Sequence, residues 1–330
     1  MANHRPHALA SVRSPCGSAC LVAHGRSCKI RCEGLRLNRI RVISPGLLTT
    51  VQDLGRPGYA HLGISASGAA DALSLRAGNL LVGNPEGAAG LEMTLAGGTF
   101  EFESGAVVAL TGADFESGVP MWTAVEVQPG EQVRCGHARS GARCYLCVSG
   151  GIEVPLVLGS ASTHLLTGLG GHEGRALKRG DVLWGASWGR RPRLQRVSRP
   201  ALPSSTTIRV TTPADTLADT LCRATWEVQP DSDRMGLRLR GPALDGHTAH
   251  MLTEGVPLGA VQVPPDGQPI ILFVEHQTTG GYPKIANVIS ADFHAVGQLR
   301  PRDPVRFEQV SIDAALALLK AQEEWLHSLV

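Results

Sequence analysis

The sequence is poor in aromatic and charged residues, and each shortage narrows the class of protein. Aromatic residues make up 4% and charged residues 18% of the 330 residues, with a net charge of +2. A nearly balanced charge gives no support to a nucleic-acid or anionic-membrane partner. No stretch approaches the roughly 20 apolar residues that span a bilayer. With 43% hydrophobic residues, we expect a globular, soluble, cytoplasmic protein.

Several motifs of known chemistry are also missing. The sequence has no G-x-x-x-x-G-K-S/T loop for nucleotide phosphates. It has no Met-Lys-Met context, so we expect no covalently attached biotin. Eight cysteines are present, including the pair Cys144 and Cys147, but their spacing does not match a structural zinc site. We therefore expect no metal, and reduced cysteines that pack as small hydrophobic residues.

Glycine and proline are abundant, with 39 and 21 residues, which predicts many tight turns and short strands. Short β-like runs recur between these turns, at the spacing of a sandwich or a barrel. They are NRIRVIS (38–44), GTFEFE (98–103), AVVALTG (106–112), WTAVEVQ (122–128), RCYLCVSG (143–150), TIRVT (207–211), GAVQVP (259–264) and PIILFVE (269–275). The predicted fold class is mainly β.

Two helices are predicted within this β pattern. Asp71 can cap the first, in which Leu73, Ala77, Leu80 and Leu81 share one face before the sequence Gly-Asn-Pro ends it. Ser311 can cap the second, whose apolar residues follow helical spacing to the end of the chain. We expect this C-terminal helix to be a packing element.

Composition divides the chain into two domains and two other segments. Residues 1–37 are basic, with no acid before Glu33, and are predicted to be a disordered extension. They are either an organellar transit peptide or, as we favour, sequence translated from a start codon assigned too early. Residues 191–207 are rich in Arg, Pro and Ser and are predicted to be a linker, which leaves domains at 38–190 and 208–330. LKRGDVLW (177–184) resembles LRPRDPVRF (299–307), which suggests two related domains.

The first candidate site is the loop VQDLGR. Gln52, Asp53 and Arg56 alternate with glycines that let a ligand approach the backbone. Asp53 and Arg56 can bind a polar substrate, or they can pair with each other and buttress a turn. Both interpretations stay open at this point.

The second candidate site combines Asn79 and Glu92. Asn79 lies off the apolar face of the first helix, and Glu92 interrupts an apolar strand. A buried acid must find a partner or shift its pKa, as site carboxylates do. The alternative, which the sequence favours slightly, is that Glu92 lies on a strand edge and faces water.

The third and strongest candidate follows a predicted buried strand, Pro269–Val274. Glu275 and His276 lead from it into QTTGGYP, where the backbone N–H groups of a diglycine turn could bind a developing oxyanion. The alternative is an ordinary hairpin, although the density of amides and hydroxyls exceeds what a turn requires. The candidate binding residues here are Gln262, Gln277, Thr278, Gly280, Gly281 and Tyr282, and Thr279 and Lys284 are candidate catalytic residues.

Eight segments together resemble one known family, over a span from Ile40 to Phe307. They are SPGLLTTVQDLGRPGY, ISASGAADALSLRAGNLLVGN, LEMTLAGG, LTGAD, YLCVSGGI, SDRMGLRL, EGVPLGAVQVPPDGQPI and QTTGGYPKIA. The sequence resembles the carboxyltransferase-like family that contains allophanate hydrolase subunit 2 and the C-type subunit of bacterial 5-oxoprolinase. The resemblance implies two cyclophilin-like β-barrel domains with a few short helices, and chemistry on an amide or a lactam.

The resemblance also implies partners and a reaction. Proteins of this kind work with B-type and A-type subunits, and the complex opens 5-oxo-L-proline to L-glutamate with ATP hydrolysis. One alternative within the family is a component acting on urea or allophanate. The absence of biotin carboxylase, biotin carrier and amidase regions favours 5-oxoprolinase. Another alternative is a non-catalytic, regulatory protein that antagonises a kinase inhibitor.

A mechanism can be expected from this resemblance. ATP would phosphorylate the lactam oxygen, and turn N–H groups, Thr278, Thr279 or Lys284 would stabilise the charge that develops there. Asp53, Glu92 or Glu275 would be the general base, and the sequence does not choose among the three. Two residues depart from the family pattern. Glu275 stands where relatives often have Asp, and Ala161 stands where many have Arg.

Overall fold

The computed structural model describes residues 38–185, 207–213, 216–244 and 252–329. The predicted extension at residues 1–37 lies outside the described residues. So does the predicted linker, apart from Thr207, which begins a strand. The division into two domains therefore stays a prediction, and the two parts of the chain are described here as the first and second halves.

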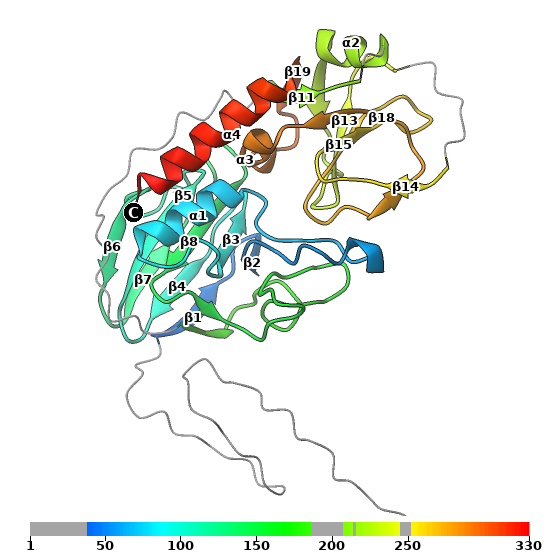
Figure 1. Ribbon diagram of the computed structural model, residues 1–330. Coiled ribbons are helices and arrows are strands. Elements are labelled where there is room, and N and C mark those ends of the chain that lie inside the picture. Colours follow the sequence, from blue (N-terminus) through cyan, green and yellow to red (C-terminus); the bar gives the residue numbers. More distant parts are fainter. Residues whose placement is uncertain (1–37, 186–206, 214–215, 245–251, 330) are drawn as a thin grey trace, which may run out of the picture. The chain divides into compact units, whose positions relative to one another are not determined.

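The first half consists of two five-stranded antiparallel sheets (Figure 1). One has the order β7-β4-β1-β10-β9, and the other has the order β2-β3-β8-β5-β6. The first contains β1 (Asn38–Ser44), β4 (Thr99–Phe102), β7 (Glu131–Arg134), β9 (Ile152–Glu153) and β10 (Val182–Gly185). The second contains β2 (Leu48–Gln52), β3 (Gly90–Thr94), β5 (Ala106–Gly112), β6 (Ala124–Val127) and β8 (Arg143–Val148).

These two sheets share one hydrophobic core. Alternate residues of β1 and β4, such as Ile40 and Phe100, point into it, as do Leu91 and Met93 of β3 and Leu146 of β8. Side chains of a strand alternate between the two faces of its sheet. Each sheet can therefore bury one face against the other sheet, while the edge strands of the two sheets stay unjoined. We predicted a closed barrel for this half, and the described residues instead form two open sheets that share a core.

The second half does form a closed barrel. Its strand order is β11-β18-β15-β16-β13-β12-β19, and β19 pairs with β11 in parallel to complete the ring. The strands are β11 (Thr207–Thr211), β12 (Thr225–Val228), β13 (Gly236–Arg240), β15 (Ala260–Gln262), β16 (Ile270–Leu272), β18 (Lys284–Val288) and β19 (Pro304–Gln309). A separate two-stranded sheet joins β14 (Glu254–Gly255) to β17 (Thr279–Gly280). The mainly β prediction is confirmed, whereas the cyclophilin-like character of either half stays a prediction.

Both predicted helices are confirmed. The first is α1 (Ala72–Leu81), whose N-cap Asp71 accepts a hydrogen bond from the backbone N–H of Ser74. Helix α1 packs against β5 and β8 (Figure 1). The second is α4 (Ile312–His327), capped by Ser311, which accepts from the N–H of Ala314. The short elements η1 (Ala60–Leu62), α2 (Thr216–Arg223), η2 (Ser290–Asp292) and α3 (Phe293–Gly297) were not predicted.

Helix α4 follows the last barrel strand and packs on both halves, against η2 of the second and α1 of the first. Its Leu326 shares a small cluster with Leu73 and Ala77 of α1. On the surface, Arg76 of α1 binds both carboxylate oxygens of Glu323 at 2.6 Å. The C-terminal helix is therefore the packing element that we predicted. At 16 residues it is the longest described helix, and no described helix has the length and apolar character to cross a membrane.

The two similar segments of the sequence form the same local turn. Asp181 accepts a hydrogen bond from the N–H of Lys178, and Asp303 accepts one from the N–H of Arg300, each at 2.8 Å. In both turns the strand follows at once, as β10 or β19. The similarity therefore reflects a repeated turn before the closing strand of each half.

Candidate functional site

Asp53 of the VQDLGR loop is buried and engaged on both carboxylate oxygens. Oδ1 accepts hydrogen bonds from the hydroxyls of Ser160 and Ser162, at 2.7 and 2.5 Å, and from the N–H of Gly55. Oδ2 accepts from the N–H of Ala161 at 2.7 Å. These contacts hold the loop at residues 160–162 against the end of β2, and they leave Asp53 little capacity for a further ligand.

Arg56 holds the same loop from another side. Its guanidinium donates to the carbonyl oxygens of Val157 and Ser162, and the side chain is buried. Burial lowers its pKa, although the Asp53 and Glu275 carboxylates oppose that shift. No ion pair joins Arg56 to Asp53 among the described residues, so the two side chains buttress one loop rather than each other. The Nη1 atom of Arg56 has no hydrogen-bond partner there.

Two predicted binding residues, Gln52 and Asn79, hold backbone carbonyls. Gln52 donates to the carbonyl of Thr163 at 3.0 Å, and its Oε1 is buried without a partner in the described structure. Asn79 donates to the carbonyls of Glu86 and Ala88 just beyond α1. Both side chains are fully buried. The structure therefore places Asn79 in the connection that follows α1, and it places Gln52 beside the 157–163 loop.

Glu92 does not face water, so the strand-edge prediction is wrong. It lies on β3, which β2 and β8 flank on either side, and it is 2% exposed. Its Oε2 accepts hydrogen bonds from the Tyr145 hydroxyl at 2.7 Å and from the N–H of Ala70 at 2.8 Å. Its Oε1 accepts from Arg234 at 2.5 Å. A central strand packed on both faces forces its acid to find buried partners.

Arg234 is the residue that joins the second and third candidate sites. Its Nε donates to Glu275 and its Nη1 donates to Glu92, each at 2.5 Å, while Nη2 donates to the carbonyl of Gly68 at 2.6 Å. Sequence reasoning did not single out Arg234. An arginine between Asp233 and Met235 in a polar turn is usually a surface residue, and its partners lie 142 and 41 positions away.

The charges around Arg234 set the direction in which its pKa shifts. Burial works against its charge, but the Glu92 and Glu275 carboxylates outweigh that effect and raise its pKa. Arg143 is equally buried, and its Nε lies 3.8 Å from Glu92. In that case burial prevails and lowers the pKa. The result is a buried cluster in which the positive charges of two arginines nearly balance the negative charges of two carboxylates.

The segment after β16 differs from the predicted turn. The strand ends at Leu272, and the N–H of His276 bonds the carbonyl of Phe273 at 2.9 Å to form a turn before the diglycine. Gly280 lies in strand β17, opposite Glu254. Neither Gly280 nor Gly281 has a positive φ. The prediction of a tight diglycine turn is therefore wrong, because this segment is partly extended.

Three predicted residues of this segment line one pocket of about 310 Å³, the glutamine pocket. Gln277 donates to Oε1 of Gln262 at 3.2 Å, and Gln262 donates to the carbonyl of Tyr282 at 3.3 Å. Asp233 and Met235 line the pocket from the other side. Tyr282 is 45% exposed, so its ring remains available to a ligand.

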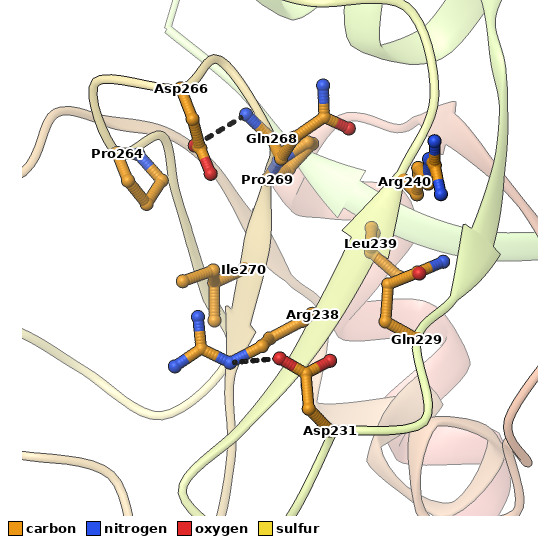
Figure 2. A pocket seen from close by; sticks show the side chains of 10 residues that line it. All are labelled: Gln229, Asp231, Arg238, Leu239, Arg240, Pro264, Asp266, Gln268, Pro269 and Ile270. Carbon is orange, nitrogen blue, oxygen red and sulfur yellow. Dashed lines mark hydrogen bonds and ion pairs between the residues drawn. The ribbon is translucent and has the colours of Figure 1, made fainter.

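A second pocket of about 350 Å³ shares four lining residues with the first (Figure 2). The shared residues are Arg238, Pro264, Asp266 and Ile270. Figure 2 shows Arg238 directed toward Asp231, with Nε 3.3 Å from the carboxylate. It also shows Asp266 accepting from the N–H of Gln268. The charged groups in this pocket are therefore of both signs.

Lys284 and Thr279 lie away from the glutamine pocket. The ammonium of Lys284 is 2.7 Å from the Glu254 carboxylate and donates to the carbonyl of Gly255. Lys284 also lines a third pocket of about 560 Å³ that extends to Ser311. Thr279 is exposed on β17, and the carbonyl of Thr278 accepts from the N–H of Val256. The structure therefore does not bring all the predicted residues together.

The three candidate carboxylates differ in what they leave free. Asp53 and Glu92 accept hydrogen bonds on both oxygens. Glu275 accepts from Arg234 and from the Ser67 hydroxyl on Oε1 alone. Its Oε2 accepts no hydrogen bond from the described residues, although the Glu275 side chain is only 4% exposed. Of the three, Glu275 has the greatest capacity to handle a proton.

The described cysteines and histidines form no metal centre. No group of three or more His, Cys, Asp or Glu residues with a suitable arrangement occurs in the described ranges. Cys135, Cys144 and Cys147 are buried and unbonded, and burial raises the pKa of the Cys135 thiol to about 12. At neutral pH such a thiol remains protonated and packs as a small apolar group.

Comparison with known proteins places the chain in a family. Residues 62–309 match the carboxyltransferase domain family, subdomains A and B. The chain belongs to this family. It is 40% identical to the 5-oxoprolinase C subunit of Escherichia coli K12, over 88% of this chain and 97% of the relative. It is 41% identical to the 5-oxoprolinase C subunit of Haemophilus influenzae, over 84% of this chain and 93% of that relative.

A solved structure supports the same relationship. The urea amidolyase of K. lactis superimposes with a TM-score of 0.79 at 30% identity, covering 88% of this chain but 20% of that protein. The predicted family is therefore confirmed. This chain corresponds to nearly the whole length of the two bacterial subunits and to one fifth of the urea enzyme.

Proposed function

We propose that this chain is the C-type subunit of a 5-oxoprolinase complex, which opens 5-oxo-L-proline to L-glutamate with ATP hydrolysis. The observation that carries the proposal is its 40% identity to the C subunit of a bacterial 5-oxoprolinase over 97% of that relative. A urea amidolyase matches at lower identity and only over a fifth of its length. The alternative of a component acting on urea or allophanate is therefore second.

Within this function, we assign the role of general base to Glu275. Ring opening adds a water oxygen to the lactam carbonyl carbon, breaks the bond from that carbon to nitrogen, and moves a proton from water to the nitrogen. The free Oε2 of Glu275 can accept the proton of the attacking water. Arg234 holds the other oxygen, which orients the carboxylate.

The glutamine pocket fits the polar groups of a lactam. Gln262 and Gln277 line it with amide groups that are bonded to each other, and Tyr282 beside them is 45% exposed. Amides can both donate to a carbonyl or carboxylate oxygen and accept from a lactam N–H. A small cyclic amide with one carboxylate needs that mixture of donors and acceptors. Thr278, Thr279, Gly280 and Gly281 belong to the same segment but do not line the pocket itself.

The described pockets do not fit the phosphates of ATP. The glutamine pocket and the pocket of Figure 2 contain Asp233 and Asp266 as well as Arg238, which is already paired with Asp231. Lys284 is paired with Glu254. A triphosphate needs several unpaired donors or cations. We therefore propose that the A-type and B-type partner subunits supply the phosphate-binding groups, and that this chain forms one wall of a shared site.

The two halves of the chain differ in how closely they match the predicted pair of barrels. The second half closes into a barrel, and the first is two sheets around one core. The matching turns at Asp181 and Asp303 support the proposal that both halves descend from one cyclophilin-like unit.

The test is reconstitution. The chain is co-expressed with its A-type and B-type subunits, purified as a complex, and assayed for glutamate released from 5-oxoproline with and without ATP. We expect glutamate only when all three proteins and ATP are present. Release of glutamate without this chain, or consumption of urea in place of 5-oxoproline, would overturn the proposal. A complex that assembles and binds a kinase inhibitor but transforms neither substrate would favour the regulatory alternative.

A further inference from the structure

The turn at residues 233–235 has two faces with different partners. Asp233 and Met235 line the glutamine pocket, whereas the side chain of Arg234 points the opposite way, into the first half. There it meets Glu92 of β3 and the carbonyl of Gly68. One residue therefore connects the back of the pocket to the core of the other half.

The same turn is bonded to the segment that carries Gln277. The N–H of Glu275 donates to the carbonyl of Arg234 at 2.8 Å, and the N–H of Phe273 donates to the carbonyl of Met235 at 2.9 Å. The Arg234 guanidinium then binds the Glu275 carboxylate as well. Two residues later, Gln277 reaches the pocket. Both walls of the pocket are thus attached to Arg234, through backbone and side-chain bonds.

The first half meets this cluster with a constrained loop. Ser67 and Gly68 both have a positive φ, and the N–H of Ser67 donates to the carbonyl of Val274 at 2.9 Å. A Cβ atom at Gly68 would lie 2.9 Å from the backbone nitrogen of Gly55. The loop therefore has little freedom to move, and it offers a fixed support for Arg234.

We propose that Arg234 is a positioning residue, whose bonds to Glu92 and Glu275 hold the two walls of the glutamine pocket in place against the first half. A buried ion pair in general contributes little net stability. The proposed role of the Arg234 ion pairs is therefore to hold the pocket walls in position. The three bonds from one planar guanidinium fix the direction of Glu275 and the approach of Gln277. The effect of Arg234 on catalysis rests on the proposed function, whereas its effect on the structure of the pocket does not.

The first experiment measures hydrogen exchange in the full chain alone and needs no activity. Glu92→Gln keeps the shape of the side chain and its contacts with Tyr145 and Ala70 but removes the charge that Arg234 binds. We expect amide exchange in residues 276–283 to rise about tenfold in Glu92→Gln and in Arg234→Lys. Unchanged exchange in residues 276–283 would overturn the proposal.

A matched control is available in the same barrel. Arg209 binds the fully buried Asp292 through two guanidinium nitrogens, and neither residue lines the glutamine pocket. Arg209→Lys therefore loosens a buried ion pair away from the pocket. We expect its exchange in residues 276–283 to equal that of the wild type. An increase there as large as in Arg234→Lys would mean that any weakened ion pair has this effect, and the proposal would fail.

The second experiment separates substrate binding from chemistry in the reconstituted complex. In Glu92→Gln, Glu275 keeps its bond to Arg234, so we expect KM for 5-oxoproline to rise about tenfold while kcat changes less than about threefold. Arg234→Lys also loses the Nε donor to Glu275, so we expect kcat to fall about tenfold in addition. Arg209→Lys is expected to leave both constants unchanged.

The two experiments fail in different ways. If the wild-type complex releases no glutamate, the proposed function is wrong, while the exchange measurement still decides whether Arg234 holds the pocket. If the complex is active and Glu92→Gln has the wild-type KM and kcat, the positioning role is wrong and the proposed function stands.

Discussion

The loop of residues 52–56 and the segment of residues 275–282 both carry acids, amides and glycines, but they use them in opposite ways. In the loop, Asp53 and Arg56 are bound to the 157–163 segment of the same half. In the segment, Glu275 keeps one oxygen that accepts no hydrogen bond from the described residues, and Gln277 and Tyr282 line a pocket. Dense polar residues therefore indicate a site only where some of their hydrogen-bonding capacity is left unused.

The difference has a simple origin in the fold. The loop follows β2, in one of the two sheets that share a core, and its polar groups bond mainly within the same half because it is packed on several sides. Gln52 Oε1 and Arg56 Nη1 are the exceptions, since they are buried without a partner in the described structure. The segment crosses from β16 to β18 on the outside of a barrel, where water can satisfy its amides. Arg234 contacts both environments, since it joins Glu92 of the first to Glu275 of the second.

The sharpest test of the buried environment is removal of its central acid. Glu92→Ala leaves Arg234 with one carboxylate partner and the Tyr145 hydroxyl without its acceptor. We expect a loss of about 3–5 kcal/mol in the free energy of unfolding, measured by urea denaturation. The exposed Glu126 on β6 provides the control, and Glu126→Ala is expected to change stability by less than about 0.5 kcal/mol. A small loss for Glu92→Ala would show that the ion cluster is dispensable.

The proposed role of Glu275 is tested by Glu275→Gln. The amide cannot accept a proton from water, so we expect kcat for glutamate release to fall about 100-fold or more. The assembly of the complex, followed by co-purification, is expected to persist. A variant with more than half of the wild-type kcat would remove Glu275 from the role of general base.

For Asp53, the contrast between the two regions predicts a loss of stability in place of a loss of kcat. Asp53→Asn loses acceptors for the Ser160 and Ser162 hydroxyls or for the N–H of Ala161, and we expect it to lower the free energy of unfolding by about 2 kcal/mol. At a temperature where the variant is folded, its kcat should stay within about threefold of the wild type. A large drop in kcat with unchanged stability would instead make Asp53 part of the chemistry.

Truncating the pocket amide should have a moderate effect on binding. Gln277→Ala removes one hydrogen-bonding group from the pocket, and we expect KM for 5-oxoproline to rise about threefold to tenfold with stability unchanged. Gln229, which lines only the neighbouring pocket, is the comparison. If Gln229→Ala raises KM and Gln277→Ala does not, the substrate occupies the pocket of Figure 2.

The smallest expected effect comes from a surface ion pair. The hydrogen bond from Arg76 lowers the pKa of Glu323, so this pair stabilises the fold above the ordinary carboxyl pKa of 4.5 and loses its effect as pH falls through the lowered value. We expect Glu323→Gln to cost about 0.5 kcal/mol at pH 7, since both side chains are partly exposed. Urea unfolding at pH 7 and at pH 3 should show this difference shrinking at the lower pH.

Local features of the fold could be read from the sequence because they depend on neighbouring residues. The caps at Asp71 and Ser311 and the strand NRIRVIS are confirmed at their predicted positions. Helical and strand periodicity, together with the turn residues, are enough for these. The polar residues 262, 277 and 282 were also predicted together, and the structure joins them in one pocket.

Features that depend on distant residues could not be predicted. The burial of Glu92 follows from its place between β2 and β8, and the role of Arg234 follows from partners in other elements. Likewise, two sheets share a core in the first half while the second closes a ring, and sequence patterns for the two are alike.

The sequence by itself thus determined several strands, the helix caps, the family and the polar character of residues 275–282, because these reflect local spacing and side-chain type. Only the tertiary structure decided which of those polar groups remain free. A polar group forms hydrogen bonds with the partners that the fold brings within about 3 Å. Chain topology alone sets those partners. For that reason Asp53 and Glu275, both buried, differ in bonding: Asp53 accepts hydrogen bonds on both oxygens and Glu275 on one.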